Sequence, residues 1–220
     1  MTYFHHIRSE IQPLLPEKIA HILEVGAGAG RTLRWLKTIY PKASTTGVEL
    51  NTVLADELKI NADVAIIGNI DECIEKLKTY DLILLLDVLE HLVDSTETLK
   101  RLSRLLVPGG NVIVSVPNIA HISVSAPLLL CRRFSYQEAG ILDHTHLRFF
   151  VEDTAIKLLN DASLVVDAGL ISGLQRRKYK MLNWVSFGLL RHHLVQQYIM
   201  RGQLVDKVEA QPKIHWTQAK

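Results

Sequence analysis

The feature that most constrains this chain is a repeated alternation between two kinds of apolar segment. One kind is short, rich in β-branched residues and bounded by Gly, Asp or Pro, whereas the other has apolar residues at three-and-four spacing. Strands that are apolar throughout are buried on both faces, so the pattern predicts an α/β fold with a doubly wound, mostly parallel sheet and helices on both faces. The expected strands are His21–Val25, Thr45–Glu49, Val64–Ile67, Leu82–Leu86 and Asn111–Val116, and the clearest helices are Arg31–Thr38 and Ser95–Leu106.

The segments on either side of this alternation extend the predicted sheet. Tyr3–Leu15 has a helical pattern, which predicts an N-terminal helix. After residue 150 the pattern resumes with a helix at Asp153–Ala162 and strands at Leu164–Leu170 and Gln196–Gly202, which brings the sheet to seven strands. The insert Asn118–Phe150 lacks this alternation, and inserts of that length in a compact domain are usually functional.

The composition is that of an ordinary globular protein, with 48% hydrophobic and 22% charged residues. The two cysteines, Cys73 and Cys131, have no metal-ligand spacing, and the first residues lack the apolar core of a signal peptide. No apolar run approaches the roughly eighteen residues that a transmembrane helix needs. We therefore expect a cytoplasmic protein with reduced thiols.

The net charge of +2 is unevenly distributed, because residues 175–220 hold nine Lys and Arg against two Asp and Glu, and the remainder holds sixteen against twenty-one. Within this basic part, the apolar run Met181–Leu190 is bracketed by Arg176–Lys178 and Arg191–His193. We expect the run to pack on the sheet edge or on a second subunit, and peripheral membrane contact is the alternative. Homo-oligomer formation stays open, and no nucleic-acid partner is expected.

The segment His21–Gly30 is an apolar strand that runs into a glycine-rich turn, followed by a helix. Gly26, Gly28 and Gly30 allow the backbone to approach a ligand closely and to adopt φ values that a Cβ hinders. The helix N-terminus behind them directs free N–H groups at the same place. Glu49 ends the next strand, twenty-one positions after Gly28, where its carboxylate can accept both hydroxyls of a ribose.

Two kinds of ligand bind to a glycine turn followed by an acidic residue in this way, a dinucleotide and S-adenosylmethionine. A dinucleotide site requires G-x-G-x-x-G, whereas this turn has G-x-G-x-G over residues 26–30, so a dehydrogenase is disfavoured. The run Glu24–Gly30 resembles the first motif of the class I S-adenosylmethionine-dependent methyltransferases, which have a Rossmann-like fold. In that family the acidic residue matched by Glu24 lies near the methionine end of the cofactor.

Three further motifs follow in the family's order. Gly68–Asp71 stands where the family usually has an Asp beside the adenine, and here Asn69 takes that place. Its amide can still accept from the adenine amino group or donate to a ring nitrogen. Tyr80–His91 resembles the fourth strand and its turn, and Leu105–Asn118 resembles the next turn and strand. The resemblance implies S-adenosylmethionine as cofactor, held by Glu24, Gly26, Ala27, Gly28, Gly30, Glu49, Leu50, Asn69, Ile70, Asp87 and Val88.

Local structural roles are the alternatives for single members of these motifs. Glu49 could cap a local helix, and Asp87 is expected to cap residues 88–92 as well as to face the cofactor. Pro108–Gly110 is expected to form a turn before the fifth strand and needs no ligand.

The region after the fifth strand carries the candidate acceptor site. Pro117–His121 (P-N-I-A-H) and Leu142–Phe150 (L-D-H-T-H-L-R-F-F) resemble the hallmarks of a methyltransferase subfamily, the domain 23 type, that often occurs in polysaccharide, lipopolysaccharide and related sugar-modifying pathways. The resemblance implies a small-molecule or glycan acceptor. Four further positions match that group: Tyr3, Arg8, Arg148 and Gln197.

Methyl transfer to a hydroxyl needs a base, because an alcohol is a poor nucleophile near neutral pH, and histidine suits that task. We expect His146 or His144 as the proton acceptor, because both flank Thr145 in a polar, aromatic-rich loop where a hydrophobic core has no use for them. The apolar neighbours of His121 favour a structural role for it. The residues expected near the acceptor are His91, Asn118, His121 and Arg148.

These features predict an O-methyltransferase that acts on a hydroxyl of a saccharide or glycan intermediate. O-methylation of a quinone-type phenol or another small metabolite is the first alternative, and a non-catalytic cofactor-binding module is the second. Asp87, Glu90 and His91 stand at i, i+3 and i+4, so a helical turn would put them on one face, where an ion could join them to His144 or His146. Because many metal-free methyltransferases carry a similar acid–histidine pair, we predict no metal.

On this interpretation, residues 1–220 form one methyltransferase domain. Residues 1–20 contain the N-terminal helix, and residues 21–117 form the cofactor-binding half. Residues 118–150 are the substrate insert, and residues 151–220 complete the sheet.

Overall fold

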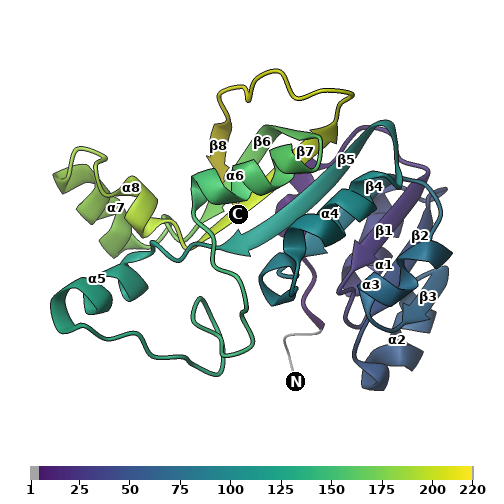
Figure 1. The fold of residues 1–220 in the computed structure, drawn as a ribbon, viewed down its shortest axis with the longest axis horizontal. Coiled ribbons are helices and arrows are strands. Elements are labelled where there is room, and N and C mark those ends of the chain that lie inside the picture. The colour runs from purple at the N-terminus through teal and green to yellow at the C-terminus, as the bar shows by residue number, and fades with distance from the viewer. Residues whose placement is uncertain (1–4, 220) are drawn as a thin grey trace.

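The computed structural model describes residues 5–219 and contains one eight-stranded sheet in the order β3-β2-β1-β4-β5-β7-β6-β8 (Figure 1). Strands β1 to β5 pair with one another in parallel, as the alternation predicts. The strands are β1 (His21–Val25), β2 (Ser44–Glu49), β3 (Val64–Ile67), β4 (Tyr80–Leu86), β5 (Leu106–Pro117), β6 (Leu164–Ser172), β7 (Gln197–Leu204) and β8 (His215–Gln218).

The core lies on both faces of this sheet, because successive side chains of a strand point to opposite faces. Along β4, Leu82 and Leu84 belong to one buried cluster, and Ile83 and Leu85 belong to the other. Helices α1 and α2 contribute to the first cluster, whereas α4 and α6 contribute to the second and lie in front of the sheet in Figure 1. Both faces are therefore covered, which confirms the predicted helix layers.

The C-terminal part departs from the seven predicted strands. Strand β7 runs antiparallel between β5 and β6, and an eighth strand, β8, pairs in parallel with the outer edge of β6. The close approach of Trp216 from β8 to Gly169 explains this pairing, because a Cβ at Gly169 would lie 2.4 Å from the indole ring. The count of seven is corrected to eight, since four residues that carry no alternating pattern complete the edge.

The helices include one inside the insert that the sequence did not predict, α5. The α-helices are α1 (Arg31–Ile39), α2 (Ala55–Asn61), α3 (Ile70–Cys73), α4 (Ser95–Ser103), α5 (Ile122–Cys131), α6 (Glu152–Asp161), α7 (Arg177–Val185) and α8 (Arg191–Leu194). The 3₁₀ helices are η2 (Ser9–Leu14), η3 (Thr52–Leu54), η4 (Ile74–Lys76) and η5 (Leu89–His91). Within residues 5–219, no helix has the length and apolar character that crossing a membrane requires.

Two expectations about local structure are wrong. The predicted N-terminal helix is, in its described part, only the short η2, which contains Pro13, and Tyr3 lies outside the described residues. Pro108–Gly110 does not form a turn that precedes the fifth strand, because it lies inside β5. The pairing of β4 with β5 shifts register there, between Tyr80 and Leu82, so the irregular residues are absorbed as a bulge.

Candidate active site

A cavity of about 810 Å³ opens at the carboxyl ends of β1, β2, β4 and β5. This is where strand order reverses between β1 and β4, and ligands of open α/β sheets bind at such a point. Of the residues predicted to bind cofactor, those that line the cavity are Gly26, Glu49, Leu50, Asn69, Ile70, Asp87 and Val88. Of the predicted acceptor and catalytic residues, His91 and His146 line it. Most of the predicted site is thus brought together at one place.

The glycine turn after β1 has the conformation that its sequence predicts. Gly26, Gly28 and Gly30 have φ values of 69°, 53° and 73°, in the left-handed region that disfavours a Cβ. A Cβ at Gly26 would also lie 2.7 Å from Cγ2 of Val88. Gly28 and Gly30 do not line the cavity, so their role is to shape the turn that presents Gly26.

Glu49 joins this turn to the end of β2. The N–H of Gly28 donates to Glu49 Oε2 over 2.7 Å, and the N–H of Asn51 donates to Oε1 over 2.8 Å. The carboxylate therefore braces two loops instead of capping a helix, since the cap of η3 is Asn51. Each oxygen of a carboxylate can accept more than one hydrogen bond, so Glu49 can still accept from a ligand in the cavity.

Glu24 is buried directly before the glycine turn and does not line the cavity. Burial raises the pKa of Glu24 to about 8, although the Arg8 guanidinium and the Thr32 hydroxyl act in the opposite direction. Its Oε2 atom has no hydrogen-bond partner among the described residues. A buried carboxyl group of this kind gains stability when a cation reaches it.

Asn69 and Ile70 lie where β3 ends and α3 begins. The Asn69 side-chain oxygen accepts from the N–H of Asp71 over 3.1 Å and caps the helix, while its amide N–H groups remain as donors. Ile70 is buried and lines the cavity beside it. Asn69 therefore combines a capping role with a place in the cavity wall.

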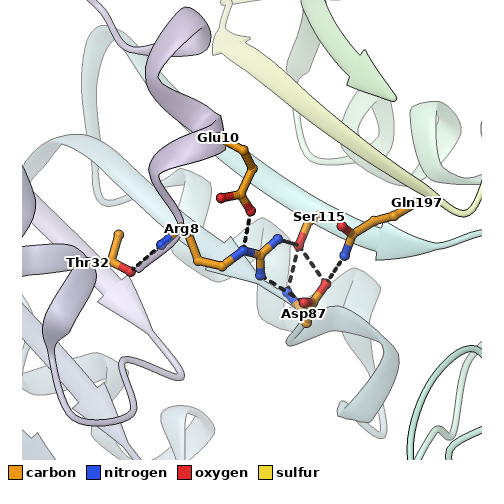
Figure 2. Close-up of polar contacts among 6 residues, drawn as sticks. All are labelled: Arg8, Glu10, Thr32, Asp87, Ser115 and Gln197. Carbon is orange, nitrogen blue, oxygen red and sulfur yellow. Dashed lines mark hydrogen bonds and ion pairs between the residues drawn. The ribbon is translucent and has the colours of Figure 1, made fainter. Parts of the chain in front are cut away.

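Asp87 lies at the end of β4 and is the centre of a polar network (Figure 2). Its φ is 59°, which is strained for a residue other than glycine. The Arg8 guanidinium donates to Oδ2 over 2.8 Å, and the Ser115 hydroxyl donates to Oδ1 over 2.7 Å. Gln197 also donates to Oδ1. The prediction that Asp87 caps the next helix is wrong, because its carboxylate is turned toward these three partners and the cap of η5 is Val88.

The insert is held against η5 by its backbone. The N–H groups of Leu147 and Arg148 donate to the carbonyl of Glu90 over 2.8 and 3.0 Å. This docking places His146 beside His91, with the ring centroids 4.8 Å apart and the rings edge to face. Two segments far apart in sequence therefore meet at the cavity.

The hydrogen bonds of the two imidazole rings assign their tautomers. His146 Nδ1 lies 3.0 Å from the carbonyl of Ile141, and His91 Nδ1 lies 3.3 Å from the carbonyl of Thr145. A carbonyl only accepts, so each Nδ1 carries a proton, and in the neutral form of either ring Nε2 is the acceptor. Burial, and then proximity to His146, lowers the pKa of His91.

Glu90 is the buried acid beside this pair of histidines. Burial, and then the Asp87 carboxylate, raise the pKa of Glu90 well above its usual range. Its Oε2 atom has no hydrogen-bond partner among the described residues. The cavity thus contains a protonatable acid next to two imidazoles, an arrangement suited to moving a proton.

Comparison with known proteins identifies the family to which this site belongs. A model of the methyltransferase domain matches residues 2–168. The chain belongs to this methyltransferase family. "Methyltransferase str2" of Strobilurus tenacellus is 29% identical over 106 residues, which are 48% of this chain and 38% of that protein. The chain therefore spans well under half the length of this curated relative.

Solved structures confirm the methyltransferase fold. An S-adenosylmethionine-dependent methyltransferase from Archaeoglobus fulgidus has a TM-score of 0.65 at 15% identity, with 89% of this chain and 91% of that chain covered. The N-methyltransferase NodS from Bradyrhizobium japonicum WM9, in complex with S-adenosylhomocysteine, has a TM-score of 0.55 at 15% identity, with 90% and 83% covered. At these identities the likeness shows the fold alone.

S-adenosylmethionine is the cofactor of this methyltransferase, and the cavity residues fit it. The glycine turn leaves room that a Cβ would fill, and Glu49 stands in the wall with acceptor capacity for ribose hydroxyls. The buried Glu24 carboxyl, whose Oε2 lacks a partner, suits the ammonium of the methionine part. Ala27 is buried behind the turn and does not line the cavity.

Four predicted acceptor-side residues lie outside the methyltransferase cavity. His144 is 57% exposed in its side chain, and Arg148 donates to the carbonyl of Val93, which fixes the insert to the loop after η5. The structural alternative for His121 agrees with its burial and with its cap of α5, where it accepts from Ser123. The fourth residue, Asn118, is fully buried.

Asn118 instead joins the end of β5 to the C-terminal segment. Its amide nitrogen donates to the carbonyls of His192 and Val195, each over 2.8 Å, and its oxygen accepts from Ala120. These bonds use the whole side chain for backbone contacts. Asn118 therefore orders the chain around the cavity without facing it.

Ser115 and Gln196 are site residues that the sequence analysis missed. Ser115 holds Asp87, and Gln196 lines the cavity from the loop before β7. Ser115 was detectable as the polar residue near the end of an otherwise apolar strand, β5. No local signal marked Gln196, because its place depends on the antiparallel return of β7 to β5.

One carboxylate and two imidazoles of the methyltransferase could also hold a divalent cation. Ligand atoms of Glu90, His91 and His146 lie within 4.8 Å of one another. Of the set considered from the sequence, Asp87 lies outside this group, because the turn is a 3₁₀ helix and the Asp87 carboxylate is bonded to Arg8 and Ser115. The two imidazoles that could ligate an ion could also take part in proton transfer, and we keep the prediction of proton transfer without a metal.

Proposed function

We propose that this methyltransferase O-methylates a hydroxyl of a saccharide or glycan intermediate, with His146 as the proton acceptor. The observation that carries the proposal is the bond from His146 Nδ1 to the carbonyl of Ile141 in a residue that lines the cavity, because in the neutral ring this bond leaves Nε2 to act as the base. The other predicted base, His144, is exposed and lies outside that wall, so it is not carried forward.

The residues of the cavity divide the work. When bound, S-adenosylmethionine supplies the methyl group as a sulfonium. Glu49 and the turn at Gly26 bind the cofactor, and Asn69 and Ile70 line the place expected for its adenine. His146 Nε2 accepts the proton of the acceptor hydroxyl as the oxygen becomes methylated, which general bases typically accelerate by a factor of about 10²–10⁴.

His91 and Glu90 support His146 in this proposal. His91 presents a second acceptor nitrogen, which can receive a hydrogen bond from a neighbouring hydroxyl of a polyhydroxylated acceptor. Glu90, whose pKa is raised, can donate a hydrogen bond while it is protonated. Several donors and acceptors around one cavity favour a saccharide over an apolar acceptor.

Two alternatives remain distinct from this function. A phenol or another small metabolite would use the same base, and the fold does not select the acceptor atom, since NodS is an N-methyltransferase. A non-catalytic module would bind the cofactor without turnover. The open Nε2 of His146 in the cavity favours catalysis over such a module.

The test is an acceptor screen that measures release of S-adenosylhomocysteine. We expect turnover with hydroxylated saccharides, and a loss of about 10²-fold or more for His146→Gln with unchanged cofactor affinity. His144→Gln is the matched control, two residues away and outside the cavity, and should keep wild-type activity. Turnover only with phenols or amines would refute the saccharide acceptor, and full activity of His146→Gln would refute the base.

A further inference from the structure

The large apolar side chains that are exposed concentrate at one end of the molecule. Ten of the seventeen within the described residues fall in two segments, 128–136 and 181–189, which we call the apolar end. Trp184 is 80% exposed, Phe187 is 95% exposed and Leu129 is 82% exposed. Scattered single residues of this kind are normal, whereas a concentration of them marks a surface that binds something.

The two segments come from different parts of the chain and lie together. Figure 1 shows α5, α7 and α8 grouped at the end opposite β1, β2 and β3. Helix α8 contacts both α5 and α7. His193 lies 2.9 Å from the carbonyl of Ala120, and the rings of His121 and Tyr179 pack edge to face at 5.5 Å. These contacts join the two segments into one surface.

The charge of this surface is mainly positive, although Glu138 is exposed beside the first segment and Glu152 pairs with His192 of α8 over 2.9 Å. Arg132 and Arg133 follow the exposed leucines of α5, and Lys178 and Lys180 precede the exposed residues of α7. Arg176, Arg177 and Arg191 are exposed on the same segments. Neither residues 118–137 nor residues 174–205 contain an Asp or a Glu. An apolar surface bordered by an excess of cations is complementary to an anionic layer with an apolar interior.

We propose that the apolar end docks on the surface of a membrane that contains anionic lipids. Trp184, Phe187 and Leu129 enter the boundary between headgroups and acyl chains, while the arginines and lysines contact lipid phosphates. A second copy of the chain is a poorer occupant, because a two-fold contact would bring identical cations together. Nucleic acid is also poorer, because phosphate contacts do not require exposed Leu and Phe side chains.

The site of docking lies next to the cavity. The insert continues from α5 to Gly140 and Ile141 in the cavity wall, and α8 leads to Gln196 and Gln197 in the same wall. Docking would therefore bring the acceptor side of the cavity near the membrane surface. Binding to lipid does not require turnover, so this proposal and the proposed function can fail separately.

Flotation of the full chain with vesicles tests the proposal. We expect binding to vesicles of phosphatidylcholine with phosphatidylserine, weaker binding to pure phosphatidylcholine, and a decrease with added salt. The double variant Trp184→Ser with Phe187→Ser should lower binding about tenfold or more, and Arg132→Glu with Arg133→Glu should do the same.

Matched controls come from the far end of the molecule. Val53→Ser with Ile60→Ser changes side chains that are 84% and 78% exposed, and Arg34→Glu changes an exposed cation of α1. Neither should alter vesicle binding. Every variant should keep the wild-type melting temperature and S-adenosylhomocysteine binding. If Trp184→Ser with Phe187→Ser does not, Leu129→Ser with Leu130→Ser replaces it.

Three results would overturn the proposal. One is the absence of binding to vesicles of either composition. Another is equal loss of binding in the control variants. The third is a dimer in solution that Trp184→Ser with Phe187→Ser dissociates without any effect on lipid binding, which would assign the surface to a second copy.

Discussion

The two sides of the cavity are built differently. On the cofactor side, the turn after β1 and the end of β2 are joined by backbone N–H groups that donate to one carboxylate, Glu49. On the acceptor side, the insert is a long segment held by a few bonds to η5, and it contributes the side chain of His146 to the cavity. The cofactor side therefore depends on backbone shape, and the acceptor side depends on which side chain faces inward. A change of acceptor therefore requires changes on the acceptor side alone, while the cofactor side can stay the same.

The strongest test of this comparison is a change of backbone shape on each side. Gly26→Val should reduce S-adenosylhomocysteine affinity by about a hundredfold or more, because φ is 69° and the new side chain meets Val88. Gly140→Ala, in the insert, should strain the backbone, because φ is 92°, but should leave cofactor affinity unchanged, because the strain falls on the acceptor side and the new Cβ meets nothing within 4 Å. Calorimetric titration measures both, and equal losses would show that the two sides are not separate.

Removal of the Glu49 carboxylate should have the next largest effect. Glu49→Ala should weaken cofactor binding by more than tenfold, because charge-assisted hydrogen bonds contribute about 1.5–3 kcal/mol. Glu49→Gln keeps the side-chain shape and one acceptor oxygen, so its cofactor affinity should lie between those of Glu49→Ala and the wild type. NAD should not raise the melting temperature of the wild type, whereas S-adenosylhomocysteine should. The reverse preference would exclude the methyltransferase cofactor.

The stability of the cofactor side should depend on pH through Glu24. Its folded pKa, about 8, lies above the ordinary value of 4.5, so its contribution to stability is fully present below about pH 4.5 and is lost as pH rises through 8. Glu24→Gln should therefore have a higher free energy of unfolding than the wild type at pH 9, by up to about 5 kcal/mol, with little difference at pH 4. Denaturant unfolding without cofactor measures this, and a difference independent of pH would contradict the buried, protonated carboxyl.

The smallest expected effect concerns metal removal on the acceptor side. If His146 works as a base, exhaustive chelation should leave turnover unchanged once an acceptor is known. Loss of activity that a divalent ion restores would instead make His146, His91 and Glu90 ligands. The comparison would then need revision, because an ion and not a tautomer would define the acceptor side.

Much of the cofactor side could be predicted from the sequence, because its signals are local. The strand, the glycine turn and Glu49 lie within residues 21–49, and their spacing alone fixes their relation. His144 and His146 could not be separated in this way, since the two residues differ only in how the insert docks. The insert docks through the carbonyl of Glu90, which accepts from the N–H groups of Leu147 and Arg148, and this docking places His146 and not His144 at the cavity. The eighth strand was missed for the same reason, because its pairing depends on Trp216 meeting Gly169 far away in sequence.

The network at Asp87 has a consequence for the order in which the chain folds. Arg8 precedes β1 and Gln197 begins β7, yet both bind the same carboxylate. Contacts between such distant residues close slowly and only after the intervening chain is present. When the glycine turn and Glu49 have formed, the cavity wall around Asp87 is therefore still incomplete. That wall is completed only when β7 pairs with β5 and Gln197 joins Arg8 at the Asp87 carboxylate.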